Sequence, residues 1–72
     1  MDKFSGKELI ILNEIINGAS NAEISNKLNI STSTVKVYVK QIFQKLNVNN
    51  RIEAEVKAVY LFLSLKNNSL QK

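Results

Sequence analysis

A small polar residue is followed three positions later by Glu at three places in this chain: Ser5–Glu8, Ser20–Glu23 and Asn50–Glu53. In a capping box of this kind the first side chain accepts a hydrogen bond from the opening turn of a helix, and the Glu accepts one from the backbone of the capping residue. The three boxes therefore predict three helix starts. A fourth start is expected within residues 31–33, where three hydroxyls can cap although no Glu completes the box.

Residues that tolerate a left-handed backbone indicate where these helices end. Gly18, Asn29 and Asn47 each stand where such a residue would close a helix. Starts and stops together predict four helices, near residues 6–17, 21–28, 32–46 and 51–66. The tail 67–72 is expected to fray, as the ends of chains commonly do.

Residues 35–40 alternate apolar and polar side chains and could also form a short strand. Over a longer range, the apolar residues of this segment are spaced four, three and four positions apart, which is the spacing of one helix face. They are Val35, Val39, Ile42 and Leu46. We therefore expect an all-α fold, with the whole chain 1–72 forming a single domain.

The second and third predicted helices, joined by a short turn around residues 29–31, form a helix-turn-helix candidate over about residues 21–46. Apolar residues on both helices and in the turn would share a core. They are Ile24, Leu28, Ile30, Val35 and Val39. The spacing alone is equally consistent with two packed helices of any helical bundle.

Positive charge is concentrated in the third segment. The chain has a net charge of +4, and residues 31–51 contain four cations and no acid. Lysines, amides, a hydroxyl and a valine occupy the side of the predicted helix opposite its apolar stripe. Lys and Gln can hydrogen bond to base edges in the major groove of DNA, and an aliphatic group can contact the thymine methyl. Each lysine taken singly is typical of solvated surface, but together these residues predict base reading by Lys36, Val37, Lys40, Gln41 and Gln44.

Hydroxyl and amide side chains stand at the N-termini of the second and third predicted helices. Ser31, Ser33 and Thr34 begin the third helix, and Ser20 and Asn21 begin the second. Such residues can cap the helix, contact a DNA phosphate, or do both, because a helix N-terminus attracts anions. For Ser20, plain capping is at least as well supported as a phosphate contact.

These segments resemble the LuxR/GerE-type helix-turn-helix signature over about residues 4–58. An opening of Phe-Ser-Gly-Lys-Glu at residues 4–8 stands where that family has Leu-Thr-x-Arg-Glu. The sequence departs from the family pattern at Ile10, Tyr38 and Asn47, where Glu, His and Gly are usual. The further matches are Ser20-Asn21-Ala22-Glu23-Ile24, Leu28-Asn29-Ile30-Ser31, Thr34-Val35-Lys36-Val37, Ile42, Lys45-Leu46, Val48, Asn50-Arg51 and Ala54.

The resemblance implies a four-helix DNA-binding domain whose third helix enters the major groove and whose fourth helix mediates dimerisation. Of the predicted base readers, Lys36, Val37 and Lys40 match base-reading positions of that family. Asn21, Thr34 and Tyr38 match positions that contact the sugar-phosphate backbone. We add the remaining hydroxyls and cations of the motif to these three. The residues predicted to contact the DNA backbone are then Ser20, Asn21, Ser31, Ser33, Thr34, Tyr38, Lys45 and Arg51.

The fourth predicted helix carries two apolar stripes on nearly opposite sides. The first contains Ile52, Val56, Val59 and Leu63. One stripe would close the monomer core and the other would form an interface, and the residues do not decide which does which. An alternative interpretation is a helix sandwiched within one monomer. A membrane-surface helix is disfavoured because the polar side carries charges of both signs. We take the second stripe as the predicted homodimer interface: Ala54, Ala58, Leu61, Phe62 and Leu65.

The prediction is a homodimeric, sequence-specific transcription regulator that binds double-stranded DNA at a pseudo-palindromic site, with half-sites about 10 base pairs apart. The alternative is a protein-interaction module that docks on RNA polymerase or another regulator and has little affinity for DNA. An enzyme is not expected, because the chain has no His and no Cys, and its carboxylates come without a nucleophile or a phosphate loop. We likewise expect no cofactor and no metal site.

The N-terminus has neither a secretory nor a transit signal. The longest near-apolar run, residues 58–65, is far shorter than the roughly 20 residues of a membrane span. We therefore expect a cytoplasmic bacterial protein outside the membrane. We expect no receiver or ligand-sensing segment beside the domain, because the sequence resembles the stand-alone GerE-like branch of the family.

Overall fold

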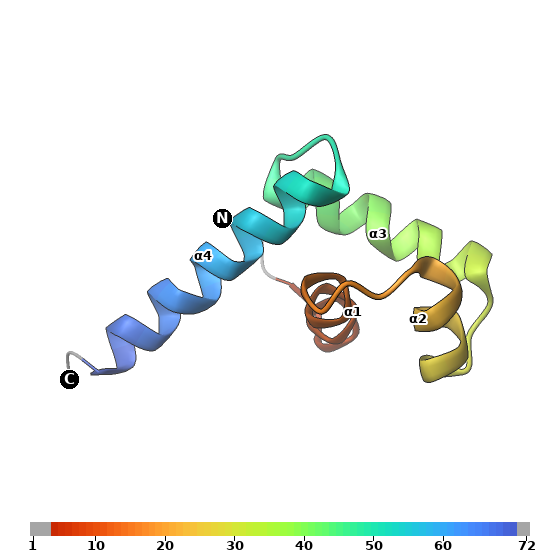
Figure 1. The fold of residues 1–72 in the computed structure, drawn as a ribbon, viewed down its shortest axis with the longest axis horizontal. Coiled ribbons are helices and arrows are strands. Elements are labelled where there is room, and N and C mark those ends of the chain that lie inside the picture. Colours follow the sequence, from red (N-terminus) through yellow and green to blue (C-terminus); the bar gives the residue numbers. More distant parts are fainter. Residues whose placement is uncertain (1–3, 71–72) are drawn as a thin grey trace.

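The structure is a computed structural model that describes the backbone of residues 4–70 and the side chains of residues 4–64. This part of the chain forms four helices and no strand, which confirms the predicted all-α fold (Figure 1). The second and third helices have the predicted bounds, but the fourth is longer. The tail that was expected to fray is helical over residues 67–70, where no Gly or Pro interrupts the helix, and residues 71–72 lie outside the described residues. The helices are α1 Gly6–Ile16, α2 Asn21–Leu28, α3 Thr32–Leu46 and α4 Arg51–Leu70.

The predicted capping boxes start the first two helices. At α1, the Ser5 hydroxyl accepts a hydrogen bond from the N–H of Glu8 at 3.1 Å, and the Glu8 carboxylate accepts one from the N–H of Ser5 at 2.7 Å. At α2, Ser20 and Glu23 repeat this arrangement with distances of 3.1 and 2.8 Å. Ser31 is the N-cap of α3, so the structure identifies which of the three candidate hydroxyls caps this helix.

The third predicted box is shifted by one residue. Asn50 Oδ1 accepts a hydrogen bond from the N–H of Glu53 at 2.9 Å, but the Glu53 carboxylate accepts one from the N–H of Asn49 at 2.9 Å. The predicted helix stops all adopt a left-handed backbone. They are Gly18 (φ 85°), Asn29 (φ 56°) and Asn47 (φ 58°).

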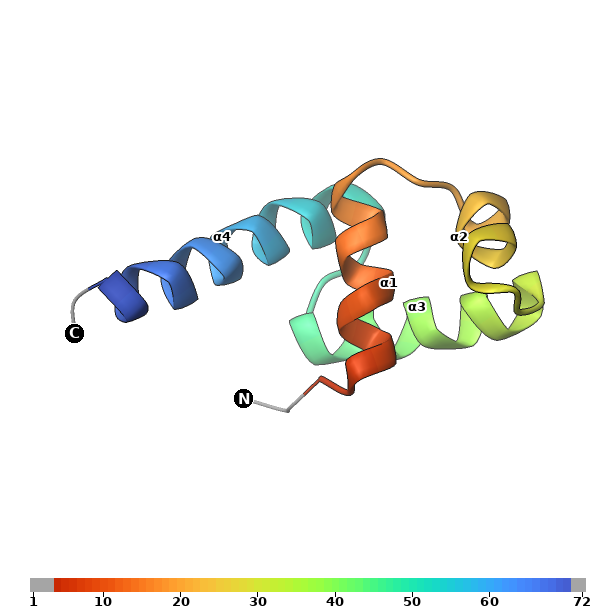
Figure 2. The ribbon, with the colours of Figure 1, turned by 90° about the horizontal axis from the view of Figure 1, so that it is seen from below.

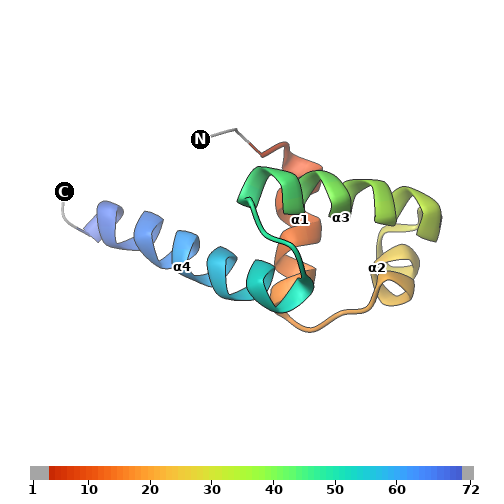
Figure 3. The same ribbon diagram turned by 90° about the horizontal axis from the view of Figure 1, so that it is seen from above.

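The first helix lies between the other parts of the molecule. α1 packs against both α3 and α4, and α2 packs against α3 (Figures 2 and 3). α2 and the C-terminal end of α4 therefore lie at opposite ends of the molecule (Figure 1). The apolar core at the centre consists of Ile11, Leu12, Ile15, Ile24, Val35, Val39, Ile42, Leu46, Ala54 and Ala58.

The stripe of α4 that contains Ala54 and Ala58 faces the core of its own chain. Both alanines are completely buried, and half-buried Leu61 packs against the same core. The prediction that these alanines form a dimer interface is therefore wrong, because the monomer already buries them. Phe62 lies at the edge of this stripe and is 37% exposed, whereas the Leu65 side chain lies outside the described residues.

The opposite stripe of α4 is the exposed one. We call it the outer stripe, and its residues are Ile52, Val56, Val59 and Leu63. Val59 is the least exposed of them at 42%, and Ile52 the most at 73%. A row of apolar side chains left in water along one helix is typical of an interaction surface.

Candidate nucleic-acid interface

The buried stripe of α3 sets the rotation of this helix, because its apolar side chains all point into the core. The opposite side of α3 is consequently exposed, and Val37 is 56% accessible there. Among the described residues, neither Lys36 nor Lys40 forms an ion pair with a carboxylate. This outer face of α3 brings together all of the predicted base readers: Lys36, Val37, Lys40, Gln41 and Gln44.

The turn between α2 and α3 is held by hydrogen bonds that fix how the two helices meet. Asn29 closes α2 in the left-handed conformation, and the N–H of Ile30 donates to the carbonyl of Ser25 at 3.1 Å. The Ser25 hydroxyl in turn donates to the carbonyl of Ile30. Because Leu28 and Ile30 also pack against the core, the direction of α3 is set by both the backbone and the apolar interior.

Exposed hydroxyls stand at the N-terminus of α3. The Ser31 hydroxyl accepts a hydrogen bond from the N–H of Thr34 at 3.1 Å and lies 2.9 Å from the Thr34 hydroxyl. Ser31, Ser33 and Thr34 are all exposed, as is Ser20 at the start of α2. One hydroxyl proton is used between Ser31 and Thr34, so the other remains able to donate to a phosphate oxygen.

Two of the residues predicted to contact the DNA backbone form contacts within the protein. Tyr38 is half-buried and packs against the core. Lys45 Nζ lies 2.7 Å from Glu8 Oε1 and 5.7 Å from the centre of the Phe4 ring. Glu8 is only 3% exposed, and its pKa is lowered, first by the hydrogen bond from Lys45 and then by that from the N–H of Ser5. In the structure the charge of Lys45 therefore balances a buried carboxylate, and its contact with the DNA backbone stays a prediction.

Arg51 was also predicted to contact the DNA backbone, and in the structure it forms hydrogen bonds within the chain. Its Nη2 donates to the carbonyl of Ala19 at 2.6 Å, and its Nη1 donates to Oδ1 of Asn21 at 3.1 Å. Both Arg51 and Asn21 are half-buried. The first residue of α4 is therefore tied to the first residue of α2, a contact for which the sequence carried no signal.

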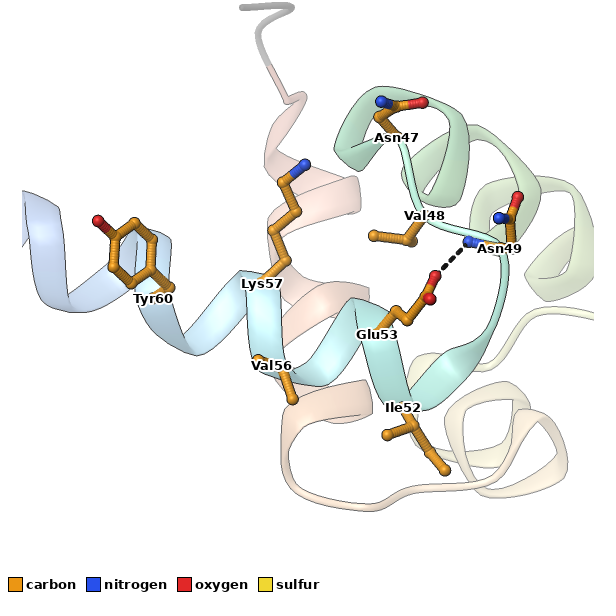
Figure 4. Close-up of a pocket in the computed structure, with 8 residues that line it drawn as sticks. All are labelled: Asn47, Val48, Asn49, Ile52, Glu53, Val56, Lys57 and Tyr60. Carbon is orange, nitrogen blue, oxygen red and sulfur yellow. Dashed lines mark hydrogen bonds between the residues drawn. The ribbon is translucent and has the colours of Figure 1, made fainter.

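An open pocket lies where the loop after α3 meets the first turns of α4 (Figure 4). Ile52 and Val56 of the outer stripe line it, together with Tyr60, which is 70% exposed. The carboxylate of Glu53 is bound to the N–H of Asn49, shown by the dashed line in Figure 4. The complete lining is Asn47, Val48, Asn49, Ile52, Glu53, Val56, Lys57 and Tyr60.

Neither a metal-binding cluster nor a membrane-spanning helix is present in the described part of the chain. No three carboxylate, imidazole or thiol side chains lie close enough there to hold a metal ion. None of the helices there combines the length and the apolar character that crossing a membrane requires.

The comparison with known proteins identifies relatives among bacterial regulators. The Escherichia coli nitrate/nitrite response regulator NarP is 44% identical over 50 residues, covering 69% of this chain and 23% of NarP. The Bacillus subtilis transcriptional regulatory protein YxjL is 40% identical over 58 residues, covering 81% of this chain and 27% of YxjL. The chain thus spans about a quarter of the length of these curated relatives.

Solved structures agree with this result. The DNA-binding domain of the response regulator ComA, crystallised with the anti-activator RapF, is 36% identical with a TM-score of 0.76, covering 78% of this chain and 97% of that domain. The response regulator ChrA of a heme-sensing two-component system is also 36% identical, with a TM-score of 0.81, covering 88% of this chain and 31% of ChrA.

The family model for bacterial regulatory proteins of the luxR family, called GerE, matches residues 2–58. This match spans α1, α2, α3 and the first part of α4, including the outer face of α3. It confirms the resemblance seen in the sequence. The chain belongs to the luxR family of bacterial regulatory proteins, as a helix-turn-helix DNA-binding domain of transcriptional regulators.

Proposed function

We propose that this protein is a sequence-specific transcription regulator that places the outer face of α3 in the major groove of double-stranded DNA. The observation that carries this proposal is the exposure of that face, whose two lysines are free of ion pairs among the described residues. A cation that is not neutralised by its own chain can replace the counterions of a phosphate or bond to guanine. The protein would act in the cytoplasm, where bacterial DNA lies.

The exposed side chains divide into two groups by the part of the DNA that they would contact. Lys36, Val37, Lys40, Gln41 and Gln44 would reach the base edges, because they project from the middle of α3. Side chains at the N-termini of α2 and α3 would contact the sugar-phosphate backbone on either side. These are Ser20, Asn21, Ser31, Ser33 and Thr34, together with the hydroxyl of Tyr38.

A second copy of the chain would complete the DNA-binding unit. The outer stripe of α4 supports this, because Ile52, Val56 and Leu63 are each more than half exposed in the single chain. Two outer stripes packed against each other would remove these side chains from water at about 25 cal/mol for each Å² of apolar surface. A twofold dimer would then read a pseudo-palindromic site with half-sites about one helical turn, or 10 base pairs, apart.

Selection of bound sequences from random duplex DNA tests the proposal. We expect an enriched motif with twofold symmetry and half-sites one helical turn apart. An enriched motif without symmetry would contradict the dimer but leave base reading in place. Recovery of unenriched DNA would contradict sequence-specific binding.

One observation favours a second function, the docking of another protein on this domain. The ComA DNA-binding domain, 36% identical to this chain, was crystallised in complex with an anti-activator. Under this alternative the domain would bind RNA polymerase or another regulator and have little affinity for DNA. A salt titration separates the two functions, because DNA binding through phosphates weakens steeply with ionic strength while apolar docking does not.

A further inference from the structure

We propose that Arg51 is a positioning residue for DNA binding, which acts by holding the amide of Asn21 at the start of α2 rather than by contacting DNA. This inference rests on the DNA-binding function proposed above. It replaces the phosphate contact that the sequence predicted for Arg51. The geometry that points to it is a single guanidinium that joins α4 to two acceptors around the first residue of α2.

The guanidinium group is suited to this bridge. Its two terminal nitrogens donate to the carbonyl of Ala19 at 2.6 Å and to Oδ1 of Asn21 at 3.1 Å. The planar guanidinium therefore holds the backbone at Ala19 and the side chain of Asn21 at the same time. Ala19 belongs to the connection between α1 and α2 and packs against the core. A lysine has one nitrogen at the end of a flexible stem and cannot reproduce this planar fork.

The bridge determines which way the amide of Asn21 faces. An amide presents an oxygen acceptor on one side and an NH₂ donor on the other. Because the donors of Arg51 face its oxygen, the NH₂ group of Asn21 is turned away from Arg51 and remains able to donate. Phosphate oxygens only accept hydrogen bonds, so this orientation presents DNA with the required donor.

The two acceptors of Arg51 are neutral oxygens, so they do not neutralise its positive charge. Among the described residues, no carboxylate forms an ion pair with this guanidinium. The substitution Arg51→Lys therefore keeps the positive charge and removes the fork. It separates the positioning of Asn21 from a general electrostatic effect.

A double-mutant cycle on the full chain tests the inference. The affinity for a short mixed-sequence DNA duplex is measured for the wild type, Arg51→Lys, Asn21→Ala and the double variant, at a temperature where circular dichroism shows all four folded. We expect Asn21→Ala to weaken binding about tenfold, as for a hydrogen bond to a charged group. Arg51→Lys should weaken binding about three- to tenfold, and the double variant should bind like Asn21→Ala alone.

A matched control uses Asn26, an exposed residue of the same helix. Asn26→Ala should leave the affinity unchanged, and the loss caused by Arg51→Lys should persist in that background. In Arg51→Gln, which removes the charge, the slope of log affinity against log salt should stay the same, whereas loss of a direct phosphate contact reduces its magnitude by about 1.

The outcomes that overturn the inference are distinct from those that overturn the function. If Arg51→Lys and Asn21→Ala have additive effects on affinity, Arg51 does not act through Asn21, and only this inference is overturned. The same holds if Arg51→Lys binds DNA like the wild type. If the wild type shows no salt-dependent binding to DNA, the proposed function and this inference are both overturned.

Discussion

The ion pair between Glu8 and Lys45 joins the first turn of α1 to the last turn of α3. Its oxygen and nitrogen lie 2.7 Å apart, and the Glu8 side chain also completes the capping box with Ser5. Lys45 remains 27% exposed on its side chain, so water still stabilises its charge if the partner is lost. The pair therefore stabilises the fold more than a surface ion pair does, but less than a fully buried one.

Replacing Glu8 by Gln should lower the free energy of unfolding at neutral pH by about 1–3 kcal/mol, less than the loss of one partner from a fully buried pair. The effect should depend on pH because the pKa of Glu8 is lowered in the folded state. A lowered folded-state pKa stabilises the fold above the pKa of the unfolded chain, about 4.3, and that contribution is lost as the pH falls through the folded value. Urea denaturation between neutral and acidic pH measures this loss.

The matched control is Glu55→Gln, since Glu55 makes no described hydrogen bond or ion pair. The stability of Glu8→Gln should fall less than that of the wild type on acidification, and the curves should converge in acid. Parallel curves for the wild type and Glu8→Gln would show that the pair does not contribute to stability.

The two lysines of the outer face of α3 carry the base preference in our proposal. Lys36→Ala and Lys40→Ala should each reduce discrimination at one position of the selected site by about 1–3 kcal/mol. Binding to a library of single-base variants of that site measures this change. Lys57→Ala, which removes an exposed cation of α4, is the control and should leave the preference unchanged. Unaltered affinity and preference in both lysine variants would contradict the assignment of this face to the groove.

At the scale of the elements, each end of α3 is determined by one residue. Ser31 satisfies the N–H of Thr34 at the beginning, and Asn47 closes the helix with a left-handed backbone at φ 58°. The chain then turns so that α4 can return across α1 (Figure 2). The conformation of Asn47 thus affects where α4 lies as well as where α3 ends.

Asn47→Ala should destabilise the fold by about 1 kcal/mol, because a residue with a Cβ and no hydrogen-bonding side chain adopts the left-handed conformation at a cost. Asn47→Gly should be neutral or slightly stabilising, since Gly adopts this conformation without strain. Thermal unfolding of the two variants beside the wild type measures the difference. Equal melting temperatures for the Ala and Gly variants would show that the backbone at this position is not a constraint on stability.

Helix starts and stops were predictable because they depend on contacts within three or four residues. The boxes at Ser5 and Ser20 and the left-handed stop at Asn47 are of this local kind. The box at Asn50 was only partly predictable, because the Glu53 side chain bonds to Asn49 in the preceding loop. The extension of α4 to Leu70 was missed, since weak helix formers lower the propensity without stopping a helix.

At the scale of the whole molecule, α4 has one stripe in the core and one in water. Ala54 and Ala58 are completely buried, whereas Val56 is 67% exposed. The pocket at the start of α4 continues the outer stripe towards the loop after α3 (Figure 4). If two copies associate, the outer stripe is an exposed apolar surface of α4 that is available for the contact.

Val56→Asp should shift the protein from dimer to monomer while leaving its helical content unchanged, because a charge on an exposed position is costly only when a partner covers it. Ala58→Asp is the matched comparison, and it should unfold the chain because it buries an unpaired charge in the core. Sedimentation equilibrium and circular dichroism measure the two effects. A Val56→Asp variant that associates like the wild type would contradict the proposed dimer surface.

The candidate DNA-binding residues of α3 could be predicted because one buried stripe is enough to tell which side of a helix faces outward. Val35, Val39 and Ile42 point inward in the structure as their spacing requires, so Lys36 and Lys40 point away. This reasoning needs no knowledge of the other helices. It does not extend to α4, whose two apolar stripes are equally able to face a core.

The amino-acid sequence by itself determined the all-α fold, the helix caps and the outer face of α3, because these follow from periodicity and from hydrogen bonds between near neighbours. Only the tertiary structure decided the partners of Lys45 and Arg51 within the chain and which of the two stripes of α4 is buried. Lys45 finds its partner 37 residues away, and Arg51 finds its two acceptors 30 and 32 residues away. Electrostatic and hydrogen-bonding groups bind whichever complementary group the packing of the helices brings within reach, and no local pattern records that choice.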